Sequence, residues 1–309
     1  WDIGAHEYIG APDTTVPESV KLIRASNQIS AIARSSNTVT VTLAADTFCN
    51  YKAGQSVRIS GIYNNTSFNG VFAISEVIDG DNDSYANGFR FVQYGPDEAG
   101  SGLTAAATAG GDYTALSAWE RSEQRNLTAS ADKAVAECYH DWPGGMVMNT
   151  AEDVLRISGW VTDSDNTITV YAPLGERHNG TLGLAGAYTG FTLVSTAYHD
   201  NTHLTVYGQS FVTIDGIASY TSENHGGFAV TQFSDYVTIK NCLHRGGANG
   251  FTLYYGGANT VVANCLAYDC TWNSSSSGFT TAGAPDGIFV NSTAVNCSVG
   301  FRLPFASVV

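Results

Sequence analysis

The chain has 309 residues, with 28 Asp and Glu against 14 Lys and Arg, which gives a formal net charge of −14 at pH 7. A basic face that could bind a phosphate backbone is therefore not expected, which excludes nucleic acid as a partner. Only 14% of the residues are charged while 43% are hydrophobic, a balance typical of β-rich extracellular or virion proteins.

Residues 1–20 are predicted to form an N-terminal strand and a linker. Pro12 and Pro17 flank Asp13-Thr14-Thr15, a composition typical of extended chain. The chain opens with Trp1-Asp2-Ile3-Gly4, without a methionine or a signal peptide, so we expect it to be processed from a longer protein. No window approaches the roughly 18 apolar residues of a membrane-spanning helix, and no membrane span is expected.

Residues 21–110 are predicted to form a small antiparallel β-sandwich or barrel. Short runs alternate apolar and polar residues between turn sequences such as Asn69-Gly70 and Asp79-Gly80, which is the pattern of half-buried antiparallel strands. The predicted strands are 38–43, 56–60, 71–78 and 89–94. A Gly- and Ala-rich stretch from Gly100 to Gly111 ends this region.

Residues 111–309 open with a predicted helix over 115–125, which has apolar residues on one side and an Asp or Thr as its N-terminal cap. After it, the sequence predicts short strands without hairpin turns. The early strands are expected at 154–157, 167–171, 191–194 and 203–207.

The later part of this region is an internal repeat of about 24 residues, the sign of a solenoid. Two landmarks keep this interval independently. One is a Gly-Phe pair, which ends in Phe228, Phe251, Phe279 and Phe301. The other is a short apolar strand followed in three cases by an asparagine, and its copies are 213–217, 238–242, 261–265 and 288–292.

A repeat of this length without helices predicts a parallel β-helix of about eight coils, because each unit must stack on the next to bury its apolar side. The predicted inward columns are the four phenylalanines and the set Ile214, Ile239, Val262 and Phe289. Asn241, Asn264 and Asn291 are predicted to form a hydrogen-bonded ladder at a bend. The six cysteines are expected to be reduced and packed as small apolar residues, and the helix is expected to cap the first coil.

These sequences resemble a known superfamily. The segment Asp112–Glu120, the sequences Ala136-Glu137-Cys138-Tyr139 and Ile157-Ser158-Gly159-Trp160, and the Asn-Cys and Gly-Phe coils are similar to right-handed parallel β-helix proteins of the pectate-lyase-like superfamily, especially to bacteriophage and metagenomic structural variants. Residues 27–110 resemble a small β-domain of phage tail and fibre proteins, and residues 2–8 resemble the tail end of such β-helix proteins. The resemblance implies an all-β architecture and marks no activity.

Catalytic chemistry on such a fold would need clustered carboxylates on one outer face, two of them for glycoside hydrolysis. The chain has no Asp-Asp dipeptide, which a polygalacturonase-like site would require. The weak catalytic candidates are Asp215, Glu223 and Arg245, for which solvated turns are the expected alternative.

No cofactor and no metal site is expected. The histidines lack the spacing of metal ligands. Asp79, Asp81 and Asp83 alternate as at the start of a calcium loop, but Ser84 and Arg90 occupy the positions where such a loop needs Gly and Glu. An acidic hairpin tip is the favoured interpretation.

Exposed aromatic residues at loop edges suit stacking on sugars, and Tyr254, Tyr255 and Trp272 are the glycan-binding candidates. The sequence favours a noncatalytic structural or adhesion protein of a phage virion or extracellular fibre, of tail-fibre, spike or decoration type. The expected partners are further copies of the chain, other virion or fibre subunits, and a surface polysaccharide. A tailspike-type polysaccharide depolymerase, either a glycoside hydrolase or a lyase, is the alternative.

Overall fold

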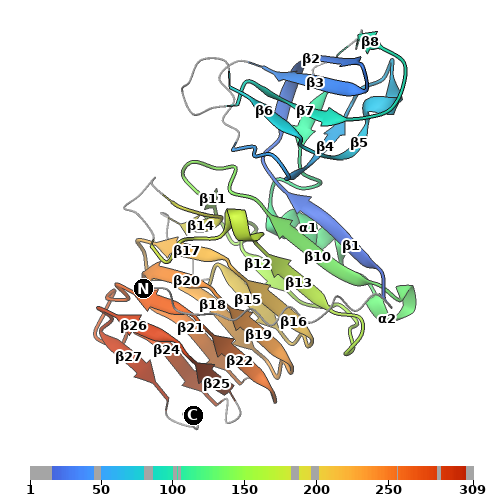
Figure 1. Cartoon of the computed structure of the whole chain (residues 1–309). Helices are drawn as coiled ribbons and strands as arrows, with labels where there is room; N and C mark the ends of the chain where they lie inside the picture. The colour runs from blue at the N-terminus through green and yellow to red at the C-terminus, as the bar shows by residue number, and fades with distance from the viewer. Residues whose placement is uncertain are drawn as a thin grey trace.

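The computed structural model describes residues 16–44, 50–79, 86–99, 103, 106–181, 188–195, 202–255, 257–283 and 287–303. Figure 1 shows an all-β molecule in which a small antiparallel sheet stands at one end of a long solenoid of parallel strands. None of the helices in this part of the chain has the length and apolar character that crossing a bilayer requires.

Three parallel sheets form the sides of the solenoid, and the chain visits them in turn, which confirms the predicted parallel β-helix. Sheet 1 has seven strands: β1 (Glu18–Ile23), β10 (Lys133–Cys138), β13 (Ile168–Tyr171), β16 (Val212–Asp215), β19 (Val237–Lys240), β22 (Thr260–Ala263) and β25 (Gly287–Val290). Sheet 2 has six: β11 (Met146–Val147), β14 (Thr192–Ser195), β17 (Ala218–Thr221), β20 (Leu243–Gly246), β23 (Leu266–Tyr268) and β26 (Thr293–Val295). Sheet 3 has six: β12 (Leu155–Ile157), β15 (Leu204–Tyr207), β18 (Gly226–Thr231), β21 (Asn249–Tyr254), β24 (Ser277–Ala282) and β27 (Val299–Arg302).

The described strands make six coils, fewer than the eight expected from a uniform repeat. The difference arises in the first two coils, where long connections such as 139–145 and 172–191 separate the strands. The interval of about 24 residues holds only from β16 onward, so dividing the whole region by it overcounts the coils.

The predicted inward columns form the core of the solenoid. Ile214, Ile239, Val262 and Phe289 stand in register on successive strands of sheet 1. The rings of Phe228, Phe251 and Phe279 are buried and stack at centroid distances of 4.9 and 5.0 Å. Phe301 continues the stack at 4.8 Å but is 43% exposed, so it is only half inside the core.

The predicted asparagine ladder lies at the bend between sheets 1 and 2. Asn241, Asn264 and Asn291 all have left-handed backbones, with φ of 52°, 53° and 47°. The side-chain amide of Asn291 donates to Asn264 (2.7 Å), that of Asn264 to Asn241 (3.4 Å), and that of Asn241 to Asp215 (2.8 Å). Asparagine tolerates this backbone and carries both a donor and an acceptor, which explains its recurrence.

The cysteines line this interior. Cys138, Cys242, Cys265 and Cys270 are buried and Cys297 is half-buried, and all five are free thiols. Burial raises the pKa of the Cys242 thiol well above its usual range. Cys49 lies outside the described residues.

The antiparallel sheet has the strand order β5-β4-β9-β2-β3-β7-β6, with β8 paired to β2. Its strands are β2 (Asn27–Ser35), β3 (Thr38–Leu43), β4 (Ser56–Ser60), β5 (Gly70–Ala73), β6 (Glu76–Ile78), β7 (Gly88–Val92), β8 (Glu98–Ala99) and β9 (Thr108–Gly110), and the short 3₁₀ helix η1 (Thr66–Phe68) precedes β5. The predicted strand over 71–78 is two strands, and β2 was not predicted as a strand. Phe68, Phe89 and Phe91 are buried in a core that is separate from that of the solenoid.

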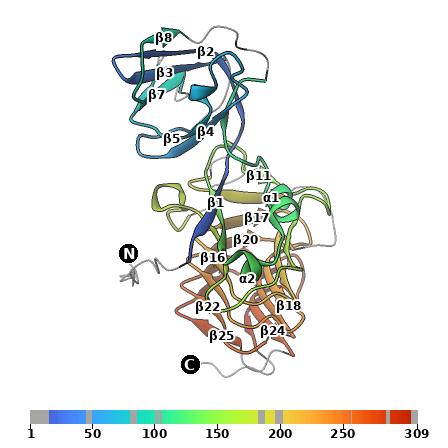
Figure 2. The ribbon, with the colours of Figure 1, turned by 90° about the vertical axis from the view of Figure 1, so that its right-hand side faces the viewer.

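The first coil is covered by β1 and by α1 (Leu116–Glu123), as Figure 2 shows from the side. Residues 18–20 of β1 were predicted to belong to the N-terminal strand and linker, and residues 21–23 to the antiparallel domain. All six pair in parallel with β10, and Leu22 and Ile23 are buried. The α1 helix lies within the predicted range, and Leu116 and Trp119 reach the solenoid core. A short helix, α2 (Leu127–Ser130), and the 3₁₀ turn η2 (Leu174–Glu176) were not predicted.

The predicted cap of α1 is wrong. The capping position is Ala115, which makes no side-chain hydrogen bond. The Asp112 carboxylate instead accepts the Leu22 backbone N–H at 2.9 Å and pairs with Arg58 at 2.6 Å. It therefore joins β1 to the antiparallel sheet.

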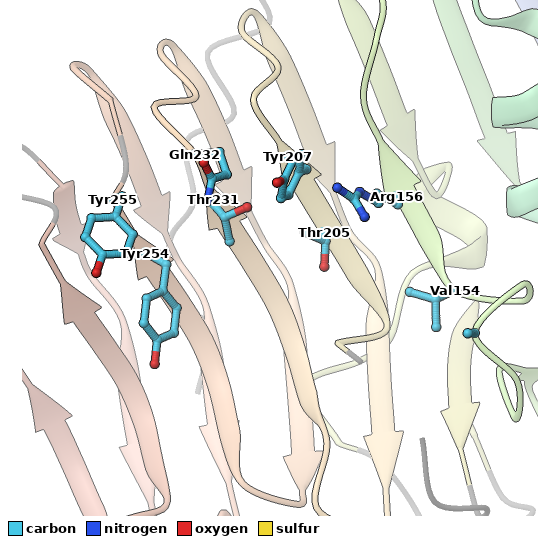
Figure 3. A pocket seen from close by; sticks show the side chains of 9 residues that line it. Val154, Arg156, Thr205, Tyr207, Thr231, Gln232, Tyr254 and Tyr255 are labelled. Atoms are coloured by element: carbon cyan, nitrogen blue, oxygen red, sulfur yellow. The ribbon is translucent and has the colours of Figure 1, made fainter. Parts of the chain in front are cut away.

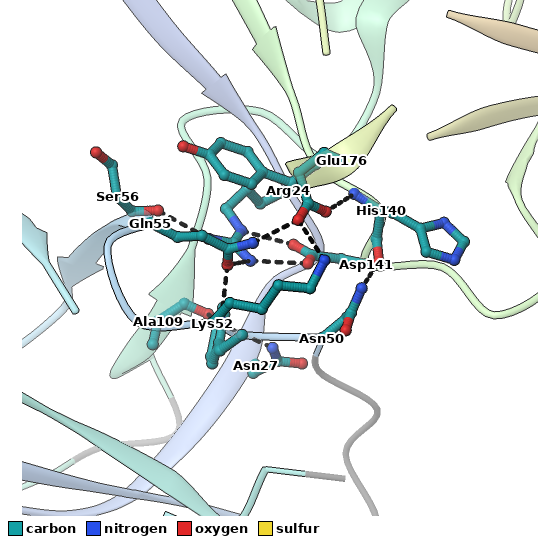
Figure 4. Close-up of polar contacts among 12 residues, drawn as sticks. Arg24, Asn27, Asn50, Lys52, Gln55, Ser56, Ala109, His140, Asp141 and Glu176 are labelled. Atoms are coloured by element: carbon teal, nitrogen blue, oxygen red, sulfur yellow. Dashed lines mark hydrogen bonds and ion pairs between the residues drawn. The ribbon is translucent and has the colours of Figure 1, made fainter. Parts of the chain in front are cut away.

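A buried ion pair lies where the two parts of the molecule meet (Figure 4). Arg24, which follows β1, donates twice to Asp141, at 2.7 and 2.8 Å, and both side chains are fully buried. The rings of Tyr51 and Tyr139 lie against its guanidinium, at 4.6 and 4.0 Å. A third donor bond, 2.8 Å long, reaches the carbonyl of Ser56 on β4.

Glu176 extends this contact. Its carboxylate is almost fully buried and accepts from Lys52 (2.7 Å), from Gln55 (2.7 Å) and from the backbone N–H of His140 (2.9 Å) (Figure 4). Lys52 and Gln55 belong to the antiparallel part, and Glu176 belongs to a solenoid loop. The contact is thus held by paired and hydrogen-bonded charges.

Candidate functional site

A groove with a volume of about 490 Å³ opens on the outside of the solenoid, where sheet 3 ends and the chain turns toward sheet 1 (Figure 3). We call it the tyrosine groove. Its walls come from the loop before β12 and from β12, β15, β18 and β21. The lining residues are Ala151, Val154, Arg156, Thr205, Tyr207, Thr231, Gln232, Tyr254 and Tyr255.

Strand alternation explains why Tyr254 faces outward. Phe251 and Leu253 of β21 are fully buried, so the next position turns to the outer face. The register places Tyr207, Thr231 and Tyr254 in one row across three strands. Tyr207 and Tyr254 are therefore two strand spacings apart, roughly 10 Å.

Tyr255 reaches the groove through a left-handed backbone. It occupies a column with Gly208, Gln232 and Gly283, in which φ is 45°, 57°, 58° and 67° respectively. A Cβ at Gly283 would lie 2.9 Å from the Tyr255 ring. The glycine thus leaves space for this ring, which is 54% exposed, and the Tyr254 ring beside it is 45% exposed.

Arg156 provides the charge of the groove. Its guanidinium carbon lies 3.7 Å from the centroid of the Tyr207 ring, a cation–π contact. The described lining includes no Asp or Glu. The groove therefore offers aromatic faces, one cation, the hydroxyl of Thr205 and the amide of Gln232.

Of the predicted glycan-binding residues, Tyr254 and Tyr255 lie in the tyrosine groove and Trp272 does not. Trp272 lines a separate pocket of about 380 Å³ at the bend between sheets 2 and 3, together with Arg245. Sequence reasoning missed Arg156, Thr205 and Tyr207 as groove residues. The alternation within 203–207, with Leu204 and Val206 buried, is the signal that turns Thr205 and Tyr207 outward.

The structure does not bring Asp215, Glu223 and Arg245 together in one described pocket. Asp215 ends β16 and pairs with Arg177 at 2.9 Å and with Lys240 at 3.4 Å. Arg245 lies on sheet 2 and pairs with Asp269 at 3.0 Å. Glu223 is half-buried in the turn between β17 and β18.

Within the described ranges, no three His, Cys, Asp or Glu side chains gather as a metal site would require. Asp79 is exposed at the end of β6, while Asp81 and Asp83 lie outside the described residues. Another cavity, of about 330 Å³, lies along the asparagine ladder under Arg177 and His178. Burial lowers the pKa of His178, whose Nε2 donates to the carbonyl of Asn241 at 2.8 Å.

Fold and groove together define a parallel β-helix protein with an aromatic-lined outer groove. No protein-family model matches the chain, and no curated protein matches it. Among solved structures, it is similar to one described as the catalytic domain of a GH87 alpha-1,3-glucanase in complex with tetrasaccharides, with 14% identity and a TM-score of 0.20. The match covers 88% of this chain and 61% of that one, and both scores are too low to indicate an activity for this chain.

Proposed function

We propose that this chain is a noncatalytic adhesion protein of a bacteriophage virion or extracellular fibre, and that it binds surface glycans in the tyrosine groove. The observation that carries the proposal is the set of three exposed tyrosines, Tyr207, Tyr254 and Tyr255, at one outer edge of sheet 3.

The chemistry of the groove fits a sugar ring. An exposed aromatic face offers an apolar surface, and the C–H face of a pyranose can stack on it without losing the hydration of its hydroxyls. Thr205 and Gln232 lie beside the rings and supply both donors and acceptors for those hydroxyls. The strands fix these groups in place, so little conformational entropy is lost on binding.

The test is a binding assay on immobilised neutral, amino-sugar and uronate oligosaccharides, with the double variant Tyr254→Ala/Tyr255→Ala. We expect the intact chain to bind at least one glycan class and the double variant to lose about 10-fold or more in affinity, because two stacking faces are removed. Tyr94→Ala is the matched control, because Tyr94 is 84% exposed on the antiparallel part and outside the groove. Equal binding by the intact chain and the double variant would contradict the proposal.

The alternative, a depolymerase, requires carboxylates at the bound sugar. Incubation with capsular and pectin-like polysaccharides, followed by assays for reducing ends and unsaturated uronates, tests it. Cleavage that disappears in Asp215→Asn or Glu223→Gln would replace the adhesion proposal with this one.

Mass measurement in solution tests the expected assembly with further copies of the chain, and a stable monomer would count against it.

A further inference from the structure

The pocket that contains Trp272, called here the tryptophan pocket, has the parts of a second sugar site. It lies at the opposite edge of sheet 3 from the tyrosine groove, between sheets 2 and 3, and has a volume of about 380 Å³. The residues that line it are Tyr220, Thr221, Ser222, Arg245, Gly246, Gly247, Asp269, Thr271 and Trp272.

The loop that carries Trp272 is held by hydrogen bonds, and the indole is accessible. Its backbone N–H donates to the carbonyl of Gly247 at 3.2 Å, which ties the loop to the neighbouring coil. The loop after it is closed by two bonds between Asn273 and Ser276, of 3.0 and 3.1 Å, and Ser276 is buried. The indole itself is 48% exposed.

The charges in the pocket compensate each other. The Nε of Arg245 donates to one oxygen of Asp269 at 3.0 Å, and the other oxygen accepts from Asn296 at 2.7 Å. Arg245 also lies over the Tyr268 ring, at 5.3 Å. An ionic ligand would have to break this pair, whereas sugar hydroxyls can bond to its edge and leave it intact.

We propose that the tryptophan pocket binds an uncharged sugar, stacked on Trp272 and hydrogen-bonded by the Arg245–Asp269 pair and by the hydroxyls of Ser222 and Thr271. The proposal rests on the proposed function, because it assigns a second contact to the same class of ligand. Gly247 and Tyr254 belong to one coil and are seven residues apart, so the two sites are separated by roughly 23 Å of strand. One polysaccharide chain can therefore occupy both sites and bind with avidity.

The experiment compares Trp272→Ala with Trp272→Phe in the full chain. The probes are maltohexaose, cellohexaose and laminarihexaose, their parent polymers, and hexagalacturonate as the charged probe. Trp272 is the natural reporter, because Trp119 and Trp160 are buried and Trp142 is half-buried among the described tryptophans. We expect a neutral hexaose to change the indole fluorescence of the intact chain. In Trp272→Ala this change should be absent.

Avidity predicts that Trp272→Ala weakens binding of a neutral polymer by about 100-fold, while Trp272→Phe, which keeps an aromatic face, recovers most of it. The Tyr254→Ala/Tyr255→Ala variant should still bind the hexaose weakly. Adding Trp272→Ala to this variant should remove the remaining binding. Unchanged polymer binding by Trp272→Ala, or a fluorescence response to hexagalacturonate alone, would overturn the second site. In that case loss of binding in the tyrosine variant would still support the proposed function, so the two failures are distinguishable.

Discussion

Gly283 illustrates how single residues shape the tyrosine groove. Gly283→Ala must accept a left-handed backbone and also displaces the Tyr255 ring, which lies 2.9 Å from the new Cβ. Gly208→Ala is a matched control, since it has a similar φ of 57° but its nearest neighbour is 3.6 Å away. We expect both to lower the free energy of unfolding by roughly 1–2 kcal/mol and only Gly283→Ala to weaken glycan binding. Urea unfolding and the oligosaccharide assay measure the two effects, and equal binding by both variants would refute this role of Gly283.

The burial of His244 should make the free energy of unfolding depend on pH. It is fully buried, its Nε2 donates to the carbonyl of Gly246 (2.9 Å), and its Nδ1 accepts from the hydroxyl of Ser219 (3.1 Å). Burial lowers its pKa to about 4, below its ordinary value of 6.5. As the pH falls, the imidazole is therefore protonated in the unfolded chain before it is protonated in the folded chain. The contribution of His244 to the free energy of unfolding is full above pH 6.5 and is lost as the pH drops from 6.5 to 4, by up to about 3 kcal/mol.

Urea titrations at pH 7.5, 5.5 and 4.5 measure this loss. His244→Gln is neutral at each pH, so its stability should vary less over the same interval. The same slope in both proteins would show that other groups cause the acid sensitivity.

At the scale of elements, the asparagine ladder links successive coils. Asn264 donates one side-chain bond and accepts another, so Asn264→Gly should lower the free energy of unfolding by about 1–2 kcal/mol. Asn264→Ala should cost roughly 1 kcal/mol more, because alanine also strains the left-handed backbone. Urea unfolding of both variants separates the two costs, and a neutral Asn264→Gly would mean that the ladder adds no stability.

The phenylalanine stack gives a second comparison along the same solenoid. Phe251 is fully buried between two rings, so Phe251→Ala should cost about 3–5 kcal/mol. Phe301→Ala should cost clearly less, because its ring is 43% exposed and has one stacking partner in the described chain. Thermal and urea unfolding measure both, and equal losses would contradict the stacked core.

The elements differ in how much of them could be predicted. The strands from β16 onward, the ladder and the stack follow from a repeat in which each position has a fixed environment. The strands of the first coils could not be predicted from the repeat, because long loops change the interval between them. The pairing of β1 could not be predicted because its partner, β10, lies more than a hundred residues away. Tyr254 could be predicted from alternation. Tyr255 faces the groove only because its backbone is left-handed, and Arg156 joins Tyr207 only through the register of β12 and β15.

At the scale of the whole molecule, Arg24 couples the antiparallel sheet to the solenoid, because it pairs with Asp141 and also donates to the carbonyl of Ser56 on β4. Arg24→Met leaves Asp141 buried without its partner, which should cost about 3–5 kcal/mol. Lys52→Met is the control, since Lys52 is half-exposed and Glu176 keeps two other donors, so the expected loss is clearly smaller than for Arg24→Met. Calorimetry should show one transition for the intact chain and two for Arg24→Met, and a single unshifted transition in Arg24→Met would show that the pair does not couple the parts.

The outward tyrosines of the groove exist only if the strands stack in the register described. A crystal structure of the chain with the tightest-binding oligosaccharide checks the groove and the register together. We expect a sugar ring in van der Waals contact with Tyr254 or Tyr255, on the outer edge of a sheet of parallel strands. An oligosaccharide bound away from both the tyrosine groove and the tryptophan pocket, or tyrosine rings turned into the core, would contradict it.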